Sequence, residues 1–162
     1  MCIRDSISGD LPEILDDSIL GDAGTTWDVI KYYDASDPAD PWKTYRVGSP
    51  NNDLVSVDCT MGYWIHLTGN SGDQFLSTGE TGEYSATPVN INLYAGWNMV
   101  GYPSATPRLA SAVLPAFADS VAYYDAGSTY MISDAAPGAV MFSEGNAYWV
   151  HVTADCVWAV EP

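Results

Sequence analysis

Basic residues are scarce in this chain of 162 residues. It holds 5 lysines and arginines against 21 aspartates and glutamates, which gives a formal net charge of −16. A field of this sign repels the phosphates of nucleic acids and the anionic headgroups of membranes, both of which attract basic patches. We therefore exclude nucleic acid as a partner. The same Asp-rich, Lys-poor composition keeps a protein soluble and is typical of acidic secreted proteins.

Cysteine and histidine are also rare. The three cysteines, Cys2, Cys59 and Cys156, are too few and too irregularly spaced for a disulfide framework or a zinc site. A bridge between Cys59 and Cys156 stays open beside the alternative of two buried thiols. The chain has only 2 histidines, whereas zinc takes three or four protein ligands. Zinc is therefore not expected.

Long apolar runs and catalytic motifs are missing as well. No stretch is long enough to cross a bilayer, and residues 1–6 resemble translated sequencing-adapter sequence rather than a signal peptide. We expect residues 1–7 to be a non-native leader. The chain has no Gly-x-Ser-x-Gly elbow, no His-Glu-x-x-His pair and no phosphate-cradling glycine loop. These absences predict neither membrane insertion within this segment nor an enzyme.

What the chain does contain is one unit written twice. The run 62–68 (GYWIHLT) returns 85 positions later as 147–153 (AYWVHVT). The run 32–35 (YYDA) returns 91 positions later as 123–126. Matched blocks kept in the same order indicate a duplicated structural unit.

The two offsets differ by six positions, so one copy carries an insertion. Thr44-Tyr45 matches Thr129-Tyr130 at the shorter offset, which places six extra residues before Thr44. We predict this insertion at Ser36–Pro41, where two Asp-Pro steps favour a loop.

The composition and residue patterns predict a mainly β (α+β) fold. Hydrophobic residues make up 47% of the chain and aromatic residues 12%, which is too apolar for a disordered chain. Each copy has one short helical pattern near its start, at 10–19 and at 109–117, followed by β-branched and aromatic segments. We expect two tandem small antiparallel-sheet modules, each with one short helix on one face. The predicted strands are 27–33, 42–47, 54–57, 62–68, 74–76, 89–93, 97–103, 120–124, 129–132, 140–142, 148–152 and 156–160.

Glycine, serine and proline between residues 79 and 88 define the boundary between the copies. The first module is predicted to cover residues 8–80 and the second residues 86–162. The second opens with Val89–Leu93 and Trp97–Pro103, which together resemble a hairpin. Nothing before Ser8 matches these strands, so we expect the first copy to lack this opening piece.

A family resemblance rests on the second copy. Its runs Gly96–Ser104, Tyr124–Ala126 and Gly145–Val152 resemble the tandem modules ("GWNLVGYPS…GYWVHV") near the C-termini of large archaeal and bacterial surface proteins. The match covers nearly all of the second copy and the later part of the first, although Ala147 replaces the usual glycine. The resemblance implies an extracellular or cell-surface, multidomain protein. It implies no common activity and supplies no catalytic residues.

The repeated strand holds the main candidate site. Alternate residues of a strand face opposite ways, so Trp64 and His66 share one face, as do Trp149 and His151. Trp and His two residues apart can form a platform on which sugar rings stack. The alternative is that this face is buried under the helix or the other copy, as large aromatic residues usually are.

A second candidate is a calcium site. Asp37 and Asp40 offer carboxylate oxygens, but their spacing and the adjacent prolines do not match an EF-hand, and a solvated turn explains them equally. We therefore expect a non-catalytic tandem repeat module of a secreted or cell-surface prokaryotic protein, acting as a spacer or interaction platform for neighbouring domains. A glycan-binding module at the Trp-His pairs and a calcium-stabilised adhesion repeat are the alternatives, and no other cofactor is expected.

Overall fold

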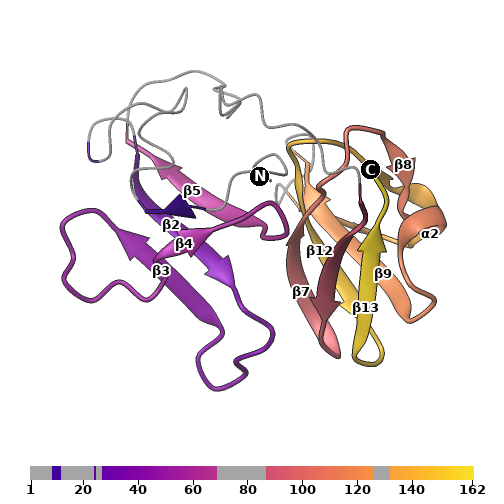
Figure 1. The fold of residues 1–162 in the computed structure, drawn as a ribbon, viewed down its shortest axis with the longest axis horizontal. Helices are drawn as coiled ribbons and strands as arrows, with labels where there is room; N and C mark the ends of the chain where they lie inside the picture. The colour runs from indigo at the N-terminus through magenta and orange to yellow at the C-terminus, as the bar shows by residue number, and fades with distance from the viewer. Residues whose placement is uncertain (1–8, 12–23, 25–26, 69–86, 126–131) are drawn as a thin grey trace.

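The protein folds into two β-rich units that follow the two copies of the sequence (Figure 1). The computed structural model describes residues 9–11, 24, 27–68, 87–125 and 132–162. The first copy lies on the left of Figure 1 and the second on the right. Strands dominate both copies, which confirms the predicted mainly β class.

The first copy is built on a three-stranded antiparallel sheet. Its central strand is β2 (Trp27–Tyr33), with β3 (Trp42–Arg46) on one side and β5 (Tyr63–Leu67) on the other. A two-stranded pair joins β1 (Gly9–Asp10) to β4 (Ser56–Val57). The core of this copy consists of Leu11, Trp27, Ile30, Leu54, Val57 and Tyr63.

The second copy has a four-stranded antiparallel sheet in the order β10-β9-β12-β7 and two strand pairs, β6 with β13 and β8 with β11. A 3-10 helix, Pro137–Ala139, precedes β11. The strands are β6 (Val89–Leu93), β7 (Gly96–Gly101), β8 (Arg108–Leu109), β9 (Ala118–Tyr124), β10 (Ile132–Ala135), β11 (Met141–Phe142), β12 (Ala147–Val152) and β13 (Cys156–Val160).

Aromatic side chains fill the centre of the second copy. The Phe142 ring centroid lies 5.5 Å from that of Tyr102 and 5.6 Å from that of Trp158, and all three side chains are almost fully buried. Along β12, Tyr148 and Val150 point into the same core. This confirms the alternation predicted for the repeated strand.

The helix of the second copy is shorter than predicted. α2 spans only Ala110–Val113, because Leu114 is already extended ahead of Pro115, whose ring disfavours helical backbone in the preceding residue. In the first copy the helix was predicted at 10–19, but Asp10 lies in β1, so the predicted start is wrong. Residues 12–19 of that helix lie outside the described part of the chain.

Strand pairing shows that the two copies share one arrangement. β2 lies between β3 and β5 as β9 lies between β10 and β12. The β1–β4 pair corresponds to the β8–β11 pair. The duplication inferred from the sequence is therefore also a duplication of structure.

The insertion predicted at Ser36–Pro41 is wrong. Tyr33 lies opposite Trp42, while its counterpart Tyr124 lies opposite Ile132. The connection between these partners holds eight residues in the first copy and seven in the second, so it accounts for one of the six extra residues. The other five lie between β3 and β5. The strand register shows this because it fixes how many residues lie between paired positions in each copy.

A short sequence match caused this error. The register places Thr44 opposite Lys31, and Asp134 holds the equivalent position opposite Ala122. Thr129 and Tyr130, which matched Thr44-Tyr45 in sequence, lie outside the described residues. Two identical residues carry too little information to define a strand register.

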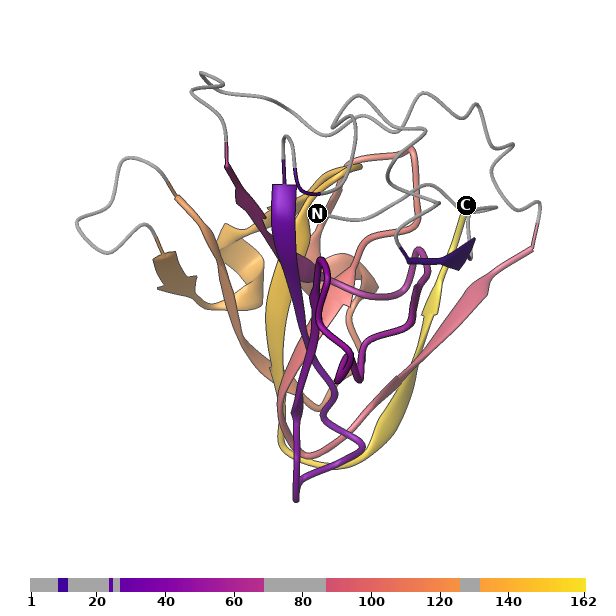
Figure 2. The same cartoon turned by 90° about the vertical axis from the view of Figure 1, so that its left-hand side faces the viewer.

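β6 and β7 do not form the predicted hairpin. β6 pairs with β13, and β7 pairs with β12. Leu93 lies opposite Cys156 and Gly96 opposite Val152. The segment that contains β6 and β7 therefore runs antiparallel to the segment that contains β12 and β13, and both turn at the bottom of Figure 2. We call residues 89–101, which contain β6 and β7, the bent strand.

Side-chain hydrogen bonds hold the corner of the bent strand. The buried Asn98 amide donates to the Tyr94 carbonyl and accepts from the Tyr94 N–H, both at 2.8 Å. The Ala95 N–H donates to a carboxylate oxygen of Asp155, also at 2.8 Å. Gly96 has a φ of 107°, which favours glycine. The residues that looked like a hairpin turn therefore redirect one strand from one sheet to another.

The first copy has no described counterpart of the bent strand. In the second copy β12 is flanked by β9 and β7, whereas β5 has only β2 beside it within the described ranges. The opening piece of the second copy, which was predicted as a hairpin, is thus a bent strand.

Candidate functional site

The repeated Trp-His pair has a different environment in each copy. Trp64 is 39% exposed and the His66 side chain 67% exposed. Trp149 is half-buried, and the His151 side chain is 33% exposed because the Trp97 ring of β7 packs edge-on against it at 5.2 Å. The four residues therefore do not form one exposed platform.

Each histidine has an aspartate partner that the sequence analysis missed. His66 Nδ1 lies 2.6 Å from Asp28 Oδ1, and His151 Nδ1 lies 2.6 Å from Asp119 Oδ1. The two aspartates stand 91 positions apart, the offset of the YYDA run. The repeat of an aspartate at this offset was the sequence signal that could have identified both partners.

A β-bulge brings each aspartate to its histidine. In the first copy Trp27 lies opposite Leu67 and Val29 opposite His66, so Asp28 is the extra residue of β2. The second copy has its register shift at the corresponding point of β9 and β12. A bulge redirects one side chain along a strand. The repeated Asp-His pair thus fixes the orientation of each imidazole ring at the surface.

The copies touch where equivalent residues of the repeated strand meet. A Cβ atom added to Gly62 would lie 2.9 Å from Cβ of Ala147, its counterpart 85 positions later. The Gly62 N–H donates to the Met99 carbonyl at 3.4 Å, and the Gly101 N–H donates to the Thr60 carbonyl at 2.9 Å. The chain before β5 therefore pairs with the outer edge of β7.

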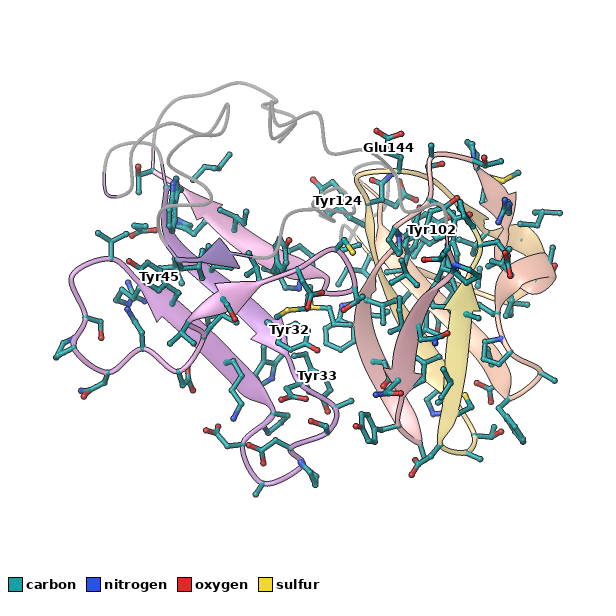
Figure 3. The ribbon with its side chains drawn as sticks, in the orientation of Figure 1. Tyr32, Tyr33, Tyr45, Tyr102, Tyr124 and Glu144 are labelled. Atoms are coloured by element: carbon teal, nitrogen blue, oxygen red, sulfur yellow. The ribbon has the colours of Figure 1, made fainter. Side chains whose placement is uncertain are left out.

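An aromatic cluster closes one side of this boundary. The Trp149 ring centroid lies 5.1 Å from Tyr33 and 5.9 Å from Trp42, and these two rings are 5.3 Å apart. Tyr33 and its neighbour Tyr32 lie at the boundary between the copies in Figure 3. Trp149 thus packs against the first copy, as the buried alternative for this face predicted.

A cleft of about 680 Å³ occupies the other side of the boundary. By strand register, the counterparts of Trp149, Tyr33 and Trp42 are Trp64, Tyr124 and Ile132, and all three line this cleft. Tyr124 lies at the upper end of the boundary in Figure 3. The same set of positions therefore forms a closed aromatic contact on one side and a cleft on the other.

A smaller, polar cleft of about 240 Å³ lies beside the closed contact. Tyr32, Asp34, Asn90 and Tyr94 are among its lining residues. Burial, together with the negative charges of Asp34 and Asp58, raises the pKa of Tyr32 to about 12. This tyrosine therefore resists ionisation in the folded protein.

This raised pKa predicts a loss of stability in alkali. Below pH 10 the phenol of Tyr32 is neutral in both states, and its contribution to stability is complete. Between pH 10 and 12 the unfolded chain loses the proton first, so the free energy of unfolding falls. Tyr32→Phe should reduce this fall. Urea denaturation at pH 9 to 11.5 measures it, and an equal fall in both proteins would contradict the assignment.

The candidate calcium ligands are engaged with a lysine. Lys43 Nζ lies 2.7 Å from Asp37 Oδ2 and 3.7 Å from Asp40 Oδ2. The hydrogen bond from Lys43 lowers the pKa of the Asp37 carboxyl. Among the described residues, no group of three or more His, Cys, Asp or Glu side chains could hold a metal ion. The arrangement favours an ion pair over a calcium site.

The bridge between Cys59 and Cys156 is not formed. Cys156 is a half-buried free thiol whose pKa is raised by burial and by Asp155. Cys59 is buried in the first copy. Cys2 lies outside the described residues.

Fold and site together define a duplicated β module whose copies are joined by strand pairing and an aromatic contact. No protein-family model, curated protein or solved structure matches the chain. Within the described ranges, no helix has the length and apolar character needed to cross a membrane.

Proposed function

We propose that this chain is a non-catalytic tandem module of a secreted or cell-surface prokaryotic protein, in which the two copies act as one rigid spacer and interaction platform. The observation that carries the proposal is the contact between the copies: backbone hydrogen bonds at Gly62 and Gly101 reinforced by Trp149. A contact of this kind supports a fixed separation between neighbouring domains.

The extracellular location is proposed on other grounds. The net charge of −16 suits a soluble secreted protein, and the GWN…YWV runs resemble modules of surface proteins. Glycan binding has less support, because Trp149 packs against the first copy, and of the four Trp and His candidates only Trp64 and His66 are exposed.

The rigid-spacer proposal predicts that both copies tumble together. NMR relaxation should give one rotational correlation time for amides of the two copies, matching a 17.4 kDa body. Trp149→Ala should separate the two values and shorten both, because it removes the aromatic contact. Trp64→Ala, at the matched position lining the cleft, should leave them equal. Two different correlation times in the unchanged protein would contradict the proposal.

A further inference from the structure

β5 and β12 are equivalent strands, but among the described residues β12 has a neighbouring strand on both sides and β5 on one. In the second copy Trp149–Val152 pairs with Gly96–Met99 of β7 on one side and with β9 on the other. In the first copy the equivalent residues, Trp64–Leu67, pair with β2 alone among the described residues. An unpaired strand edge presents a row of N–H and C=O groups that another strand can pair with.

The exposure of the two histidines reflects this difference. Trp97 of β7 packs against His151 and leaves its side chain 33% exposed, whereas His66 is 67% exposed. Each histidine has its own aspartate partner at 2.6 Å, so both imidazole rings are oriented in the same way. In the second copy β7 carries the tryptophan that covers His151, and no described strand covers His66 in the first copy.

The residues just before this edge already pair with β7 of the second copy. Thr60 and Gly62 pair with Met99 and Gly101 through two backbone hydrogen bonds. Beyond Gly62 the 680 Å³ cleft runs beside β5, and Trp64, Ile65 and Leu67 line it. The edge of Trp64–Leu67 therefore opens into a space lined on its far side by residues of the second copy.

We propose that the β5 edge at Trp64–Leu67 binds an extended polypeptide segment with the Gly-Trp-x-apolar pattern of β7, supplied by a partner chain. The bound segment pairs antiparallel with β5, and its tryptophan packs on His66 as Trp97 packs on His151. Backbone hydrogen bonds supply affinity, and the alternating side chains supply specificity. This names a partner for the interaction role proposed above, but it rests on the difference between β5 and β12.

The probe is a fluorescein-labelled peptide of residues 89–103 added to the full chain, with binding followed by fluorescence anisotropy. We expect saturable binding that His66→Ala weakens about two- to fivefold, the range of one cross-strand aromatic pair. His151→Ala is the matched control and should bind the peptide like the unchanged protein. A Trp97→Ala peptide should lose a similar factor against the unchanged protein and nothing further against His66→Ala.

Three results would overturn the proposal. The first is no saturable binding. The second is equal weakening by His66→Ala and His151→Ala, or weakening by His151→Ala alone, which would place the peptide outside the β5 edge. The third is a dimer of the unchanged chain in sedimentation velocity that His66→Ala dissociates, which would make a second copy of this chain the occupant. None of these results would alter the shared tumbling of the copies, so the spacer proposal is tested separately.

Discussion

Gly62→Ala is expected to destabilise the protein by about 1–3 kcal/mol, the usual cost of forcing extra atoms into a packed contact. The new Cβ would lie 2.7 Å from the Val100 carbonyl oxygen and 2.9 Å from Cβ of Ala147. The first of these neighbours belongs to the backbone of β7, which cannot move without disturbing its pairing with β12. The substitution should therefore open the contact between the copies. Urea denaturation measures the cost.

Two variants test whether the cost comes from this contact. Gly138→Ala adds the same atom where the nearest neighbour, Ser111 Oγ, would be 3.9 Å away, so it should leave stability unchanged. Ala147→Gly added to Gly62→Ala removes the clash between side chains but not the clash with Val100. It should restore part of the lost stability. Full stability of Gly62→Ala alone would show that the copies do not pack as closely as described.

Trp158→Ala should have a still larger effect, about 3–5 kcal/mol, as expected for deleting a buried aromatic side chain. Trp158 is 1% exposed and packs with Tyr102 and Phe142 at the centre of the second copy. A loss of this size is comparable to the whole stability of a small domain, about 5–15 kcal/mol. We expect the second copy to be largely unfolded in mild denaturant. Far-UV circular dichroism during urea titration measures this loss.

The neighbouring residue provides the control. Val157 lies on the same strand but is 56% exposed, so Val157→Ala should change stability by no more than about 0.5 kcal/mol. Because β7 pairs with the chain before β5, the first copy should lose stability together with the second in Trp158→Ala. A first copy that keeps its own transition at the original urea concentration would show that the two cores are independent.

Much of the fold could be predicted because the signals are local. Alternating residues identify the strands, and Tyr148 and Val150 are buried as their period of two requires. The repeat, visible in 62–68 and 147–153, predicts that both copies share one arrangement. Such features depend on residues close together in the chain.

Other features depend on pairing between distant residues and were missed. The bent strand looked like a hairpin because Gly96 has the same conformational freedom in a turn and in a corner, and only β12 and β13 decide between them. The partners of His66 and His151 are 38 and 32 positions away. The packing of Trp149 on Tyr33 depends on how the copies meet. The sequence could name the Trp-His residues but not their different exposure.

The meeting of Gly62 with Ala147 has a consequence for how such a protein can arise. Equivalent residues of the two copies meet here, as they do at the axis of a homodimer, where both subunits must carry the same residue. Two alanines would collide here, since their Cβ atoms would be 2.9 Å apart. Fusing both subunits into one gene removes the constraint, because each position then evolves alone. A glycine at position 62 facing an alanine at the equivalent position 147 is therefore a combination that a fused chain can hold and a homodimer cannot.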